Sequence, residues 1–165
     1  MKDEELLRYS RQIMLPQVDI DGQQKLIDSS AMIIGMGGLG SPSAYYLAAA
    51  GVGHLIIADF DQVELSNLQR QIIHSTADIG KDKVDSAKET LTALNPEIKV
   101  TTIKELTAEN LMSLVSHADI VLDGTDNFKS RFAINKACVA AKTPLVSAAV
   151  IRFEGPLSVF KGYGA

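Results

Sequence analysis

Gly35-Met36-Gly37-Gly38-Leu39-Gly40 follows directly on a compact apolar run, Ala31–Gly35, that predicts a buried strand. A helix is predicted to begin immediately afterwards, at Ser41-Pro42, because proline is tolerated in the first turn of a helix. Glycines 35, 37 and 40 have the G-x-G-x-x-G spacing, which permits a tight turn and brings backbone N–H groups close to a phosphate. In this strand–turn–helix order, the motif predicts a nucleotide site. The alternative is that the glycines serve only close helix–strand packing.

Strand and helix patterns alternate along the rest of the chain. The predicted strands are Ala31–Gly35, His54–Ala58, Ile98–Ile103, Ala118–Leu122, Leu145–Ala149 and, at an edge because of Pro156, Gly155–Phe160. The predicted helices of this part are Ser41–Ala50, which Gly51 is expected to end, Lys83–Leu94, Thr107–Val115, which Thr107 is expected to cap, and Phe128–Ala141. This alternation predicts an α/β fold, namely a Rossmann-like, doubly wound, mostly parallel sheet with helices on both faces.

The chain has 165 residues and is expected to form one domain. Residues 1–29 are expected to be an N-terminal helical arm and residues 30–165 the Rossmann-like core. In the arm, Leu6, Ile13 and Met14 fit one face of a first helix, and Gly22–Asp28 fits a second helix.

Composition and charge exclude several classes of protein. The net charge of −4 argues against a general nucleic-acid binder, which usually presents a basic face. A single cysteine, Cys138, excludes an intramolecular disulfide and any zinc site built from several cysteines of this chain. The polar N-terminus has no signal-peptide core, and no apolar run is long enough to span a bilayer. We therefore expect a cytoplasmic protein that does not contact membranes.

An acidic residue follows the second predicted strand. Asp59 lies 19 residues beyond Gly40, where a carboxylate can accept hydrogen bonds from the hydroxyls of a ribose. Asp61 and Glu64 come next, and two interpretations stay open for them: binding of a metal or sugar, or solvated loop carboxylates.

The segment Ser66-Asn67-Leu68-Gln69-Arg70-Gln71 distinguishes the kind of nucleotide. Asn67 and Arg70 are three residues apart, so on a helical turn they share a face. The planar fork of arginine suits phosphate, and Lys83, after Asp82, opens a helix from which a cation can reach phosphate. A dinucleotide dehydrogenase does not need this positive charge, whereas an enzyme that splits ATP does.

The fourth predicted strand ends beside two more acids, Asp123 and Asp126. Ligands of doubly wound sheets bind at the carboxyl ends of the strands, and Mg²⁺ bridges one or two carboxylates to phosphates. Asp126 is the candidate for the metal, with Asp123 as its rival. A helix N-cap is the alternative for either residue, and Asn127 is expected to cap the next helix in any case.

Together these motifs resemble the adenylating enzymes related to ubiquitin-activating enzyme, specifically the bacterial MoeB/ThiF/HesA group. The resemblance covers almost the whole chain. It rests on Arg8-Tyr9-Ser10-Arg11-Gln12, Asp21-Gly22-Gln23, Gly35–Gly40, Ser66–Gln71, Gly80 with Lys83, Asn95-Pro96, and Leu122–Asn127 with Arg131. It implies an ATP-dependent adenylyltransferase that transfers AMP from Mg-ATP to the C-terminal Gly-Gly carboxylate of a small ubiquitin-like sulfur-carrier protein and releases pyrophosphate.

The resemblance also implies roles for individual residues. Gly38 and its neighbours, among them Leu39, would lie against the nucleotide, and Asp59 would hold the ribose. The implied phosphate contacts are Asn67, Arg70 and Lys83, with Ser66 and Gln69 in the same nucleotide-binding segment. Asp126, followed by Asn127, would serve the magnesium. The family forms a homodimer in which the N-terminal arginine, here Arg11, reaches into the partner's site.

The chain departs from the family pattern in its length. Family members continue through a loop with a sulfur-accepting cysteine and four zinc-ligand cysteines, so we expect the last strands of the family fold to be missing. The chain would then be a fragment, a truncated gene product or a short homologue. Cys138 is expected to be a buried structural thiol, and His54, His74 and His117 lack metal-ligand spacing and are assigned no chemistry.

Other functions stay open at this point. They are a catalytically incomplete fragment that binds nucleotide and partner, an NAD-dependent oxidoreductase, and an enzyme that activates the carboxylate of a tRNA base. The carrier also stays open among the molybdopterin, thiamine and other thiolation pathways. Ile151-Arg152-Phe153-Glu154-Gly155 is slightly closer to the molybdopterin branch.

Overall fold

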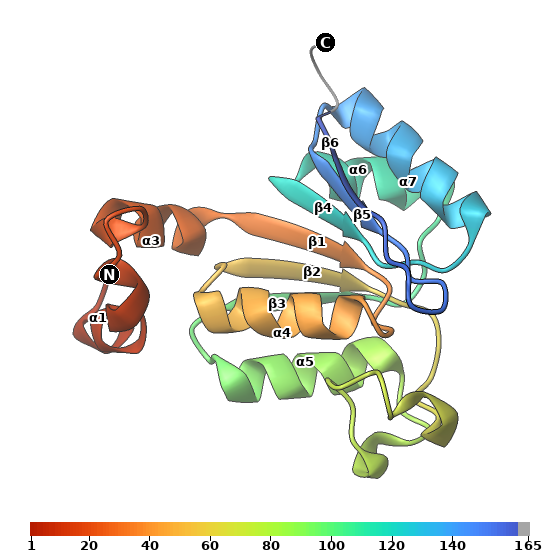
Figure 1. The fold of residues 1–165 in the computed structure, drawn as a ribbon, viewed down its shortest axis with the longest axis horizontal. Coiled ribbons are helices and arrows are strands. Elements are labelled where there is room, and N and C mark those ends of the chain that lie inside the picture. Colours follow the sequence, from red (N-terminus) through yellow and green to blue (C-terminus); the bar gives the residue numbers. More distant parts are fainter. Residues whose placement is uncertain (162–165) are drawn as a thin grey trace.

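The computed structural model describes residues 1–161. One sheet has the strand order β3-β2-β1-β4-β5-β6, parallel throughout except that β6 is antiparallel to β5 (Figure 1). The strands are β1 Ser30–Ile34, β2 His54–Ala58, β3 Lys99–Ile103, β4 Ile120–Asp123, β5 Leu145–Ala148 and β6 Leu157–Phe160. The α-helices are α1 Asp3–Arg8, α2 Ser10–Ile13, α3 Asp19–Asp28, α4 Gly40–Ala50, α5 Lys83–Leu94, α6 Ala108–Ser116 and α7 Phe128–Ala141. Two 3₁₀ helices lie between β2 and α5, η1 Leu65–Asn67 and η2 Thr76–Asp78.

Helices cover both faces of the sheet, because successive side chains of a strand point to opposite faces. In β1, Ala31 and Ile33 belong to the core beneath α4 and α5. Met32 and Ile34 belong to the second core, beneath α6 and α7. The Rossmann-like, doubly wound fold predicted from the sequence is confirmed.

The strand order reverses at β1, which has β2 on one side and β4 on the other (Figure 1). Ile34, the last residue of β1, is in register with Ala58 of β2 and Asp123 of β4. The loops after these three strands therefore start side by side. This is the place where doubly wound sheets bind ligands.

Most helix ends occur where the sequence predicts them. Gly51 ends α4 in the left-handed conformation, with φ of 86°. The Thr107 hydroxyl accepts a hydrogen bond from the Asn110 amide and begins α6. Asn127 caps α7 by accepting a hydrogen bond from the amide of Ser130 at 2.9 Å. These predictions rest on local capping chemistry, and they are confirmed.

The N-terminal arm differs from its prediction. The sequence pattern predicts one helix with Leu6, Ile13 and Met14 on one face, but the chain forms two short helices on either side of Tyr9. Leu6 and Met14 are exposed, and the buried residue between these two helices is Tyr9. Its hydroxyl accepts a hydrogen bond from Nδ2 of Asn95, at 2.8 Å. The contact that positions the arm comes from a remote segment, which helical periodicity cannot indicate.

The predicted strand bounds agree with the observed ones to within two residues. Strand β4 begins at Ile120 instead of Ala118, and the intervening Asp119 uses its carboxylate to accept hydrogen bonds from the amide and hydroxyl of Ser30. Strand β6 is an edge strand, as Pro156 predicts. Within residues 1–161, no helix has the length and hydrophobicity needed to cross a membrane.

Candidate nucleotide-binding site

The glycine turn lies at the carboxyl end of β1 and is held by both polar groups of the Met36 backbone. The N–H of Met36 donates to Oδ2 of Asp59 at 2.7 Å. Its carbonyl accepts hydrogen bonds from Oγ of Ser41 at 3.2 Å and from Nε2 of His74 at 3.1 Å. The Met36 side chain is fully buried in the core beneath α4. This residue therefore anchors the turn, and the glycines that follow it are oriented by that anchor.

The glycines of the turn fall into two classes. A Cβ on Gly40 would overlap the carbonyl oxygen of Gly35, and a Cβ on Gly35, whose φ is +94°, would lie 2.9 Å from the oxygen of Gly124. These two positions require glycine for packing. At Gly37 and Gly38, the nearest atoms to an added Cβ would be 3.7 and 3.5 Å away, in ordinary contact. Packing does not explain glycine there, whereas the close approach of a ligand to the backbone does.

The polar segment after β2 lies over this open part of the turn. The methylene carbons Cγ and Cδ of Arg70 are the atoms nearest to the space above Gly38. The Nη2 atom of Arg70 donates to Oδ1 of Asn67 at 3.0 Å, which confirms that the two side chains share a face. The hydroxyl of Ser66 donates to the carboxylate of Glu64, and the side-chain amide of Gln69 donates to the Ser66 carbonyl. Arg70 is an exposed residue.

Lys83 begins α5 and is buried, with 5% of its surface exposed. Its Nζ forms an ion pair with Oδ2 of Asp61 at 2.8 Å, and that carboxylate is half-exposed. The amide of Asp61 in turn donates to Oδ1 of Asp59 at 2.8 Å. One chain of contacts therefore links the glycine turn to Lys83 through the two acids. For Asp61, whose role the sequence left open, the observed partner is this lysine.

The two candidate metal ligands after β4 have different surroundings. Asp123 is buried, and its carboxylate accepts hydrogen bonds from the amide and hydroxyl of Thr125 and from the hydroxyl of Ser147. Arg131 braces the same loop by donating to the carbonyls of Thr125 and Ala148. Asp126 is exposed, and its carboxylate accepts none of the hydrogen bonds found within residues 1–161.

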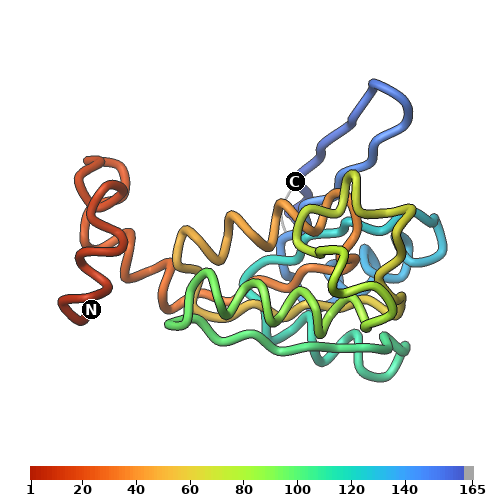
Figure 2. Tube along the Cα trace, turned by 90° about the horizontal axis from the view of Figure 1, so that it is seen from below, coloured from red at the N-terminus to blue at the C-terminus, as the bar shows by residue number. Residues whose placement is uncertain are grey.

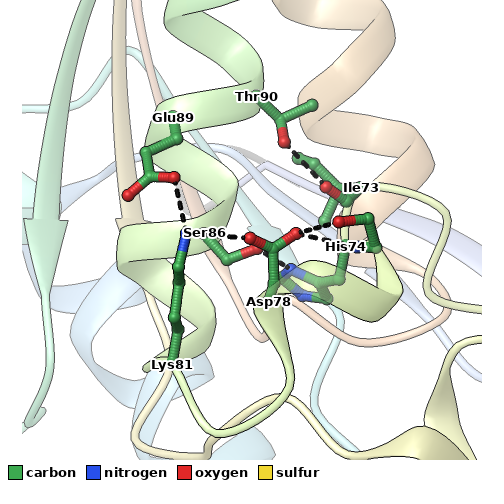
Figure 3. A network of polar contacts seen from close by, with 8 residues as sticks. Ile73, His74, Asp78, Lys81, Ser86, Glu89 and Thr90 are labelled. Carbon is green, nitrogen blue, oxygen red and sulfur yellow. Dashed lines mark hydrogen bonds and ion pairs between the residues drawn. The ribbon is translucent and has the colours of Figure 1, made fainter.

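His74, to which the sequence assigned no chemistry, also belongs to this site. Its ring is buried between the glycine turn and α5, and its Nδ1 lies 2.8 Å from Oγ of Ser86 (Figure 3). Burial lowers the pKa of His74 below its ordinary value, and the nearby positive charge of Lys83 lowers it further. The histidines of the chain lack metal-ligand spacing, and a histidine that bonds a backbone carbonyl leaves no pattern in the sequence.

Gln71 is a second buried polar residue beside the turn, 4% exposed. Its amide nitrogen is the nearest atom to an added Cβ on Gly37. Its Oε1 is the one buried side-chain nitrogen or oxygen of the described residues that lacks a hydrogen-bond partner. An unpaired buried acceptor is rare in proteins, and it fits a site that receives a hydrogen-bond donor from a ligand or water.

Arg11 is remote from this site in its own chain. It is exposed on α2, and the adjacent Gln12 donates from Nε2 to the Ala50 carbonyl at the last residue of α4. The glycine turn lies at the other end of α4, and an 11-residue helix is about 16 Å long. Figures 1 and 2 show the arm at the end of the sheet opposite to the glycine turn.

Cys138 lies on α7 in the core between that helix and the sheet, as expected for a structural thiol. Burial raises its pKa to about 11, so the thiolate is scarce at neutral pH. Residues 1–161 contain no group of three or more His, Cys, Asp or Glu side chains arranged to hold a metal. A metal that bridges phosphates does not need such a group, since Mg²⁺ takes one or two carboxylates and completes its shell with phosphate oxygens and water.

Comparison with known proteins identifies relatives along almost the whole chain. The chain is 53% identical over 160 residues to the sulfur carrier protein ThiS adenylyltransferase of Escherichia coli. The match covers 96% of this chain and 64% of that protein. The chain is 51% identical over 161 residues to the molybdopterin-synthase adenylyltransferase of the same organism, covering 97% and 65%. Among solved structures, the E. coli tRNA N6-threonylcarbamoyladenosine dehydratase TcdA in complex with ATP superposes with a TM-score of 0.83 at 28% identity, over 88% of this chain and 60% of that one.

The chain thus spans about two thirds of the length of these curated relatives. The family match itself extends over residues 9–165 and includes the glycine turn, Arg70, Lys83 and Asp126. From this match and from the fold, we conclude that the chain belongs to the ThiF family.

Proposed function

We propose that residues 1–165 form a single ATP-binding adenylation domain. In the proposed reaction, AMP is transferred from ATP to the C-terminal glycine carboxylate of a small ubiquitin-like sulfur-carrier protein. One observation carries the proposal: the cationic side chain of Arg70 lies over Gly38, where packing does not require glycine, and its guanidinium donates to Asn67. The relatives named as ThiS and molybdopterin-synthase adenylyltransferases support this reaction.

The proposed chemistry is a substitution at the α-phosphate. A carboxylate oxygen of the carrier forms a bond to the α-phosphorus, the bond from that phosphorus to the bridging oxygen breaks, and pyrophosphate leaves. The carboxylate is already a nucleophile, so the site needs positioning and charge neutralisation rather than a general base. Arg70 and Lys83 would contact the phosphates, with Asn67 orienting Arg70. Asp59 would also hold the ribose.

Asp126 is the carboxylate we assign to Mg²⁺, because the carboxylate of Asp123 already accepts hydrogen bonds from Thr125 and Ser147. When bound, the metal would neutralise charge on the phosphates as pyrophosphate departs. Asn127 would keep its place as the cap of α7 beside this ligand.

We further propose a homodimer in which Arg11 of each subunit acts in the site of the other. Within one chain, Arg11 lies at the opposite end of α4 from the glycine turn, so Arg11 can serve this site only in the dimer, from a second copy. We assign the reaction to the cytoplasm, because its co-substrate is ATP.

Carrier-dependent exchange of labelled pyrophosphate into ATP tests the proposal. Exchange should require the carrier's terminal carboxylate and should be lost in Lys83→Met. A folded dimer that shows no exchange with ThiS-type or MoaD-type carriers would contradict the proposal for this chain.

A second candidate, which the sequence left open, is a domain that binds nucleotide but does not catalyse AMP transfer. ATP binding measured by calorimetry without any exchange would establish this candidate. Competition by NADH, or exchange that depends on tRNA instead of a carrier, would point to the remaining alternatives.

A further inference from the structure

We propose that His74 is a positioning residue that orients the glycine turn for ATP and fixes its distance from the helix that carries Lys83. The inference rests on the proposed function, because it concerns the same nucleotide site. It assigns a role to a residue that touches neither the proposed nucleotide contacts nor the metal ligand directly.

The two ring nitrogens of His74 have different partners, and these partners fix the tautomer. The Met36 carbonyl can only accept a hydrogen bond, so Nε2, which lies 3.1 Å from it, carries the proton and donates. Nδ1 of the neutral ring is then an acceptor, and the Ser86 hydroxyl donates to it at 2.8 Å. Figure 3 shows the ring of His74 beside Ser86 of α5.

The bond to Met36 acts on the turn through the planarity of the peptide unit. The carbonyl of Met36 and the N–H of Gly37 belong to one rigid plane and point in opposite directions. A donor that fixes the direction of the carbonyl therefore also fixes the direction of the Gly37 N–H. That N–H is the first one in the open part of the turn, where an added Cβ meets nothing closer than 3.7 Å.

The bond to Ser86 links this geometry to Lys83. Ser86 follows Lys83 by three residues on α5, so the two side chains lie on the same face of the helix. His74 itself follows Arg70 by four residues in the chain. The ring therefore joins the glycine turn, the arginine segment and the lysine helix.

The surroundings of the His74 ring favour its neutral form, in which Nε2 donates to Met36 and Nδ1 accepts from Ser86. Burial and the charge of Lys83 lower the pKa of His74, while the bond to the Met36 carbonyl and the carboxylates of Asp59 and Asp78 act in the opposite direction. The direction of the net shift is downward, so the ring is neutral at pH 7 and above.

Two substitutions distinguish the hydrogen bonds that the two ring nitrogens of His74 make. In His74→Gln, the side-chain amide extends far enough to donate to the Met36 carbonyl. In His74→Asn, the shorter amide ends near the position of Nδ1 and retains only a contact to Ser86. The matched control is Thr90→Ala, which removes the 2.9 Å hydrogen bond from Thr90 on α5 to the carbonyl of Ile73 without touching the turn (Figure 3).

Calorimetric titration with Mg-ATP at pH 7.5 measures the effect. We expect His74→Asn to weaken ATP binding about tenfold, whereas His74→Gln and Thr90→Ala stay within about threefold of the unmodified chain. His74→Asn and Thr90→Ala should have similar unfolding midpoints, which separates positioning from general stability. If the unmodified chain binds ATP and His74→Asn binds it equally well, the role of His74 is wrong while the proposed function stands.

Failure of the unmodified chain to bind ATP would contradict the proposed function. The role of His74 can then still be tested by a measurement that needs no ligand. Nitrogen-15 NMR of the imidazole should show the proton on Nε2. The amide resonance of Gly37 should move in His74→Asn and stay near its position in His74→Gln. A proton on Nδ1, or a Gly37 resonance unaffected by either substitution, would overturn the inference.

Discussion

Nζ of Lys83 lies 2.8 Å from Oδ2 of Asp61, and the amide of the same lysine donates to the Asp61 carbonyl at 2.9 Å. The two partners are unequal, since 6% of the lysine side chain and 52% of the aspartate side chain are exposed. Water can solvate the aspartate if it loses its partner, but it reaches the lysine poorly. Removing Asp61 would therefore leave a buried cation without a partner at the first turn of α5, whereas removing Lys83 would leave a carboxylate that water can solvate.

This asymmetry gives a prediction for stability and binding. Asp61→Asn should destabilise the fold by about 1–3 kcal/mol, because it leaves a buried charge without its partner, whereas Lys83→Met should cost less. Lys83→Met should nevertheless weaken ATP binding more than tenfold, because it removes the proposed phosphate contact. Urea unfolding and calorimetry measure the two effects. Equal losses of stability would contradict the asymmetry.

Alanine at two glycines should separate packing from ligand binding. Gly40→Ala should cost about 3 kcal/mol or more, or prevent folding, because its Cβ would overlap the Gly35 carbonyl. Gly38→Ala should leave the unfolding midpoint nearly unchanged, since its Cβ has ordinary contacts with Arg70, but it should impair ATP binding. Thermal unfolding combined with ATP titration checks both. A Gly38→Ala chain that binds ATP normally would argue against the turn as the phosphate cradle.

Mixing two inactive variants tests whether Arg11 acts in the partner's site. Arg11→Ala and Arg70→Ala homodimers should both lack adenylation activity. After subunit exchange, half of the dimers are mixed, and each mixed dimer has one intact site, so about a quarter of the original activity per site should return. Native mass spectrometry verifies the exchange. No recovery in a mixture shown to contain mixed dimers would exclude the arrangement.

The lowered pKa of His74 predicts a pH dependence of folding. The unfolded chain binds a proton at His74 near the ordinary value of 6.5, and the folded chain binds it only at lower pH. The neutral ring's contribution is complete above pH 6.5 and is lost as the pH falls from there through the folded-state pKa. Urea unfolding between pH 7.5 and 5 should show a steeper loss of stability in the unmodified chain than in His74→Gln. His54, whose pKa is also lowered by burial, should account for part of the remaining slope.

Cys138 should be inert in the folded chain. With a pKa of about 11, roughly one thiol in a thousand is ionised at pH 8, and the side chain is buried. Alkylation by iodoacetamide at pH 8 should be at least about a hundredfold slower than in the unfolded chain. The control is Val139→Cys in a Cys138→Ala background, because position 139 is exposed on the same helix. Rapid labelling of the native Cys138 would contradict its structural role.

The features predicted well from the sequence are those fixed by neighbouring residues. The glycine turn, the caps Thr107 and Asn127, the end of α4 at Gly51 and the strand–helix alternation all occur in the structure close to their predicted positions. Each depends on a backbone conformation or hydrogen bond within a few residues. The sequence itself therefore contains the determining interaction.

The features that were missed depend on remote partners. The arm bends at Tyr9 because its hydroxyl bonds to Asn95, and His74 belongs to the site because its ring contacts Met36. Neither pair has a spacing in the chain that indicates contact. Lys83 was identified as a cation, but its burial against Asp61 was not.

The sequence by itself determined the fold class, the position of the turn and the residue types that we propose to contact phosphate, because periodicity and capping act over a few residues. The tertiary structure decided which of these side chains meet. In the folded chain, the carboxylate of Asp123 accepts hydrogen bonds from Thr125, whereas Asp126 is exposed. Arg11 lies at the far end of α4 from the turn. Burial and long-range hydrogen bonds arise only when distant segments pack together, so these distinctions required the folded chain.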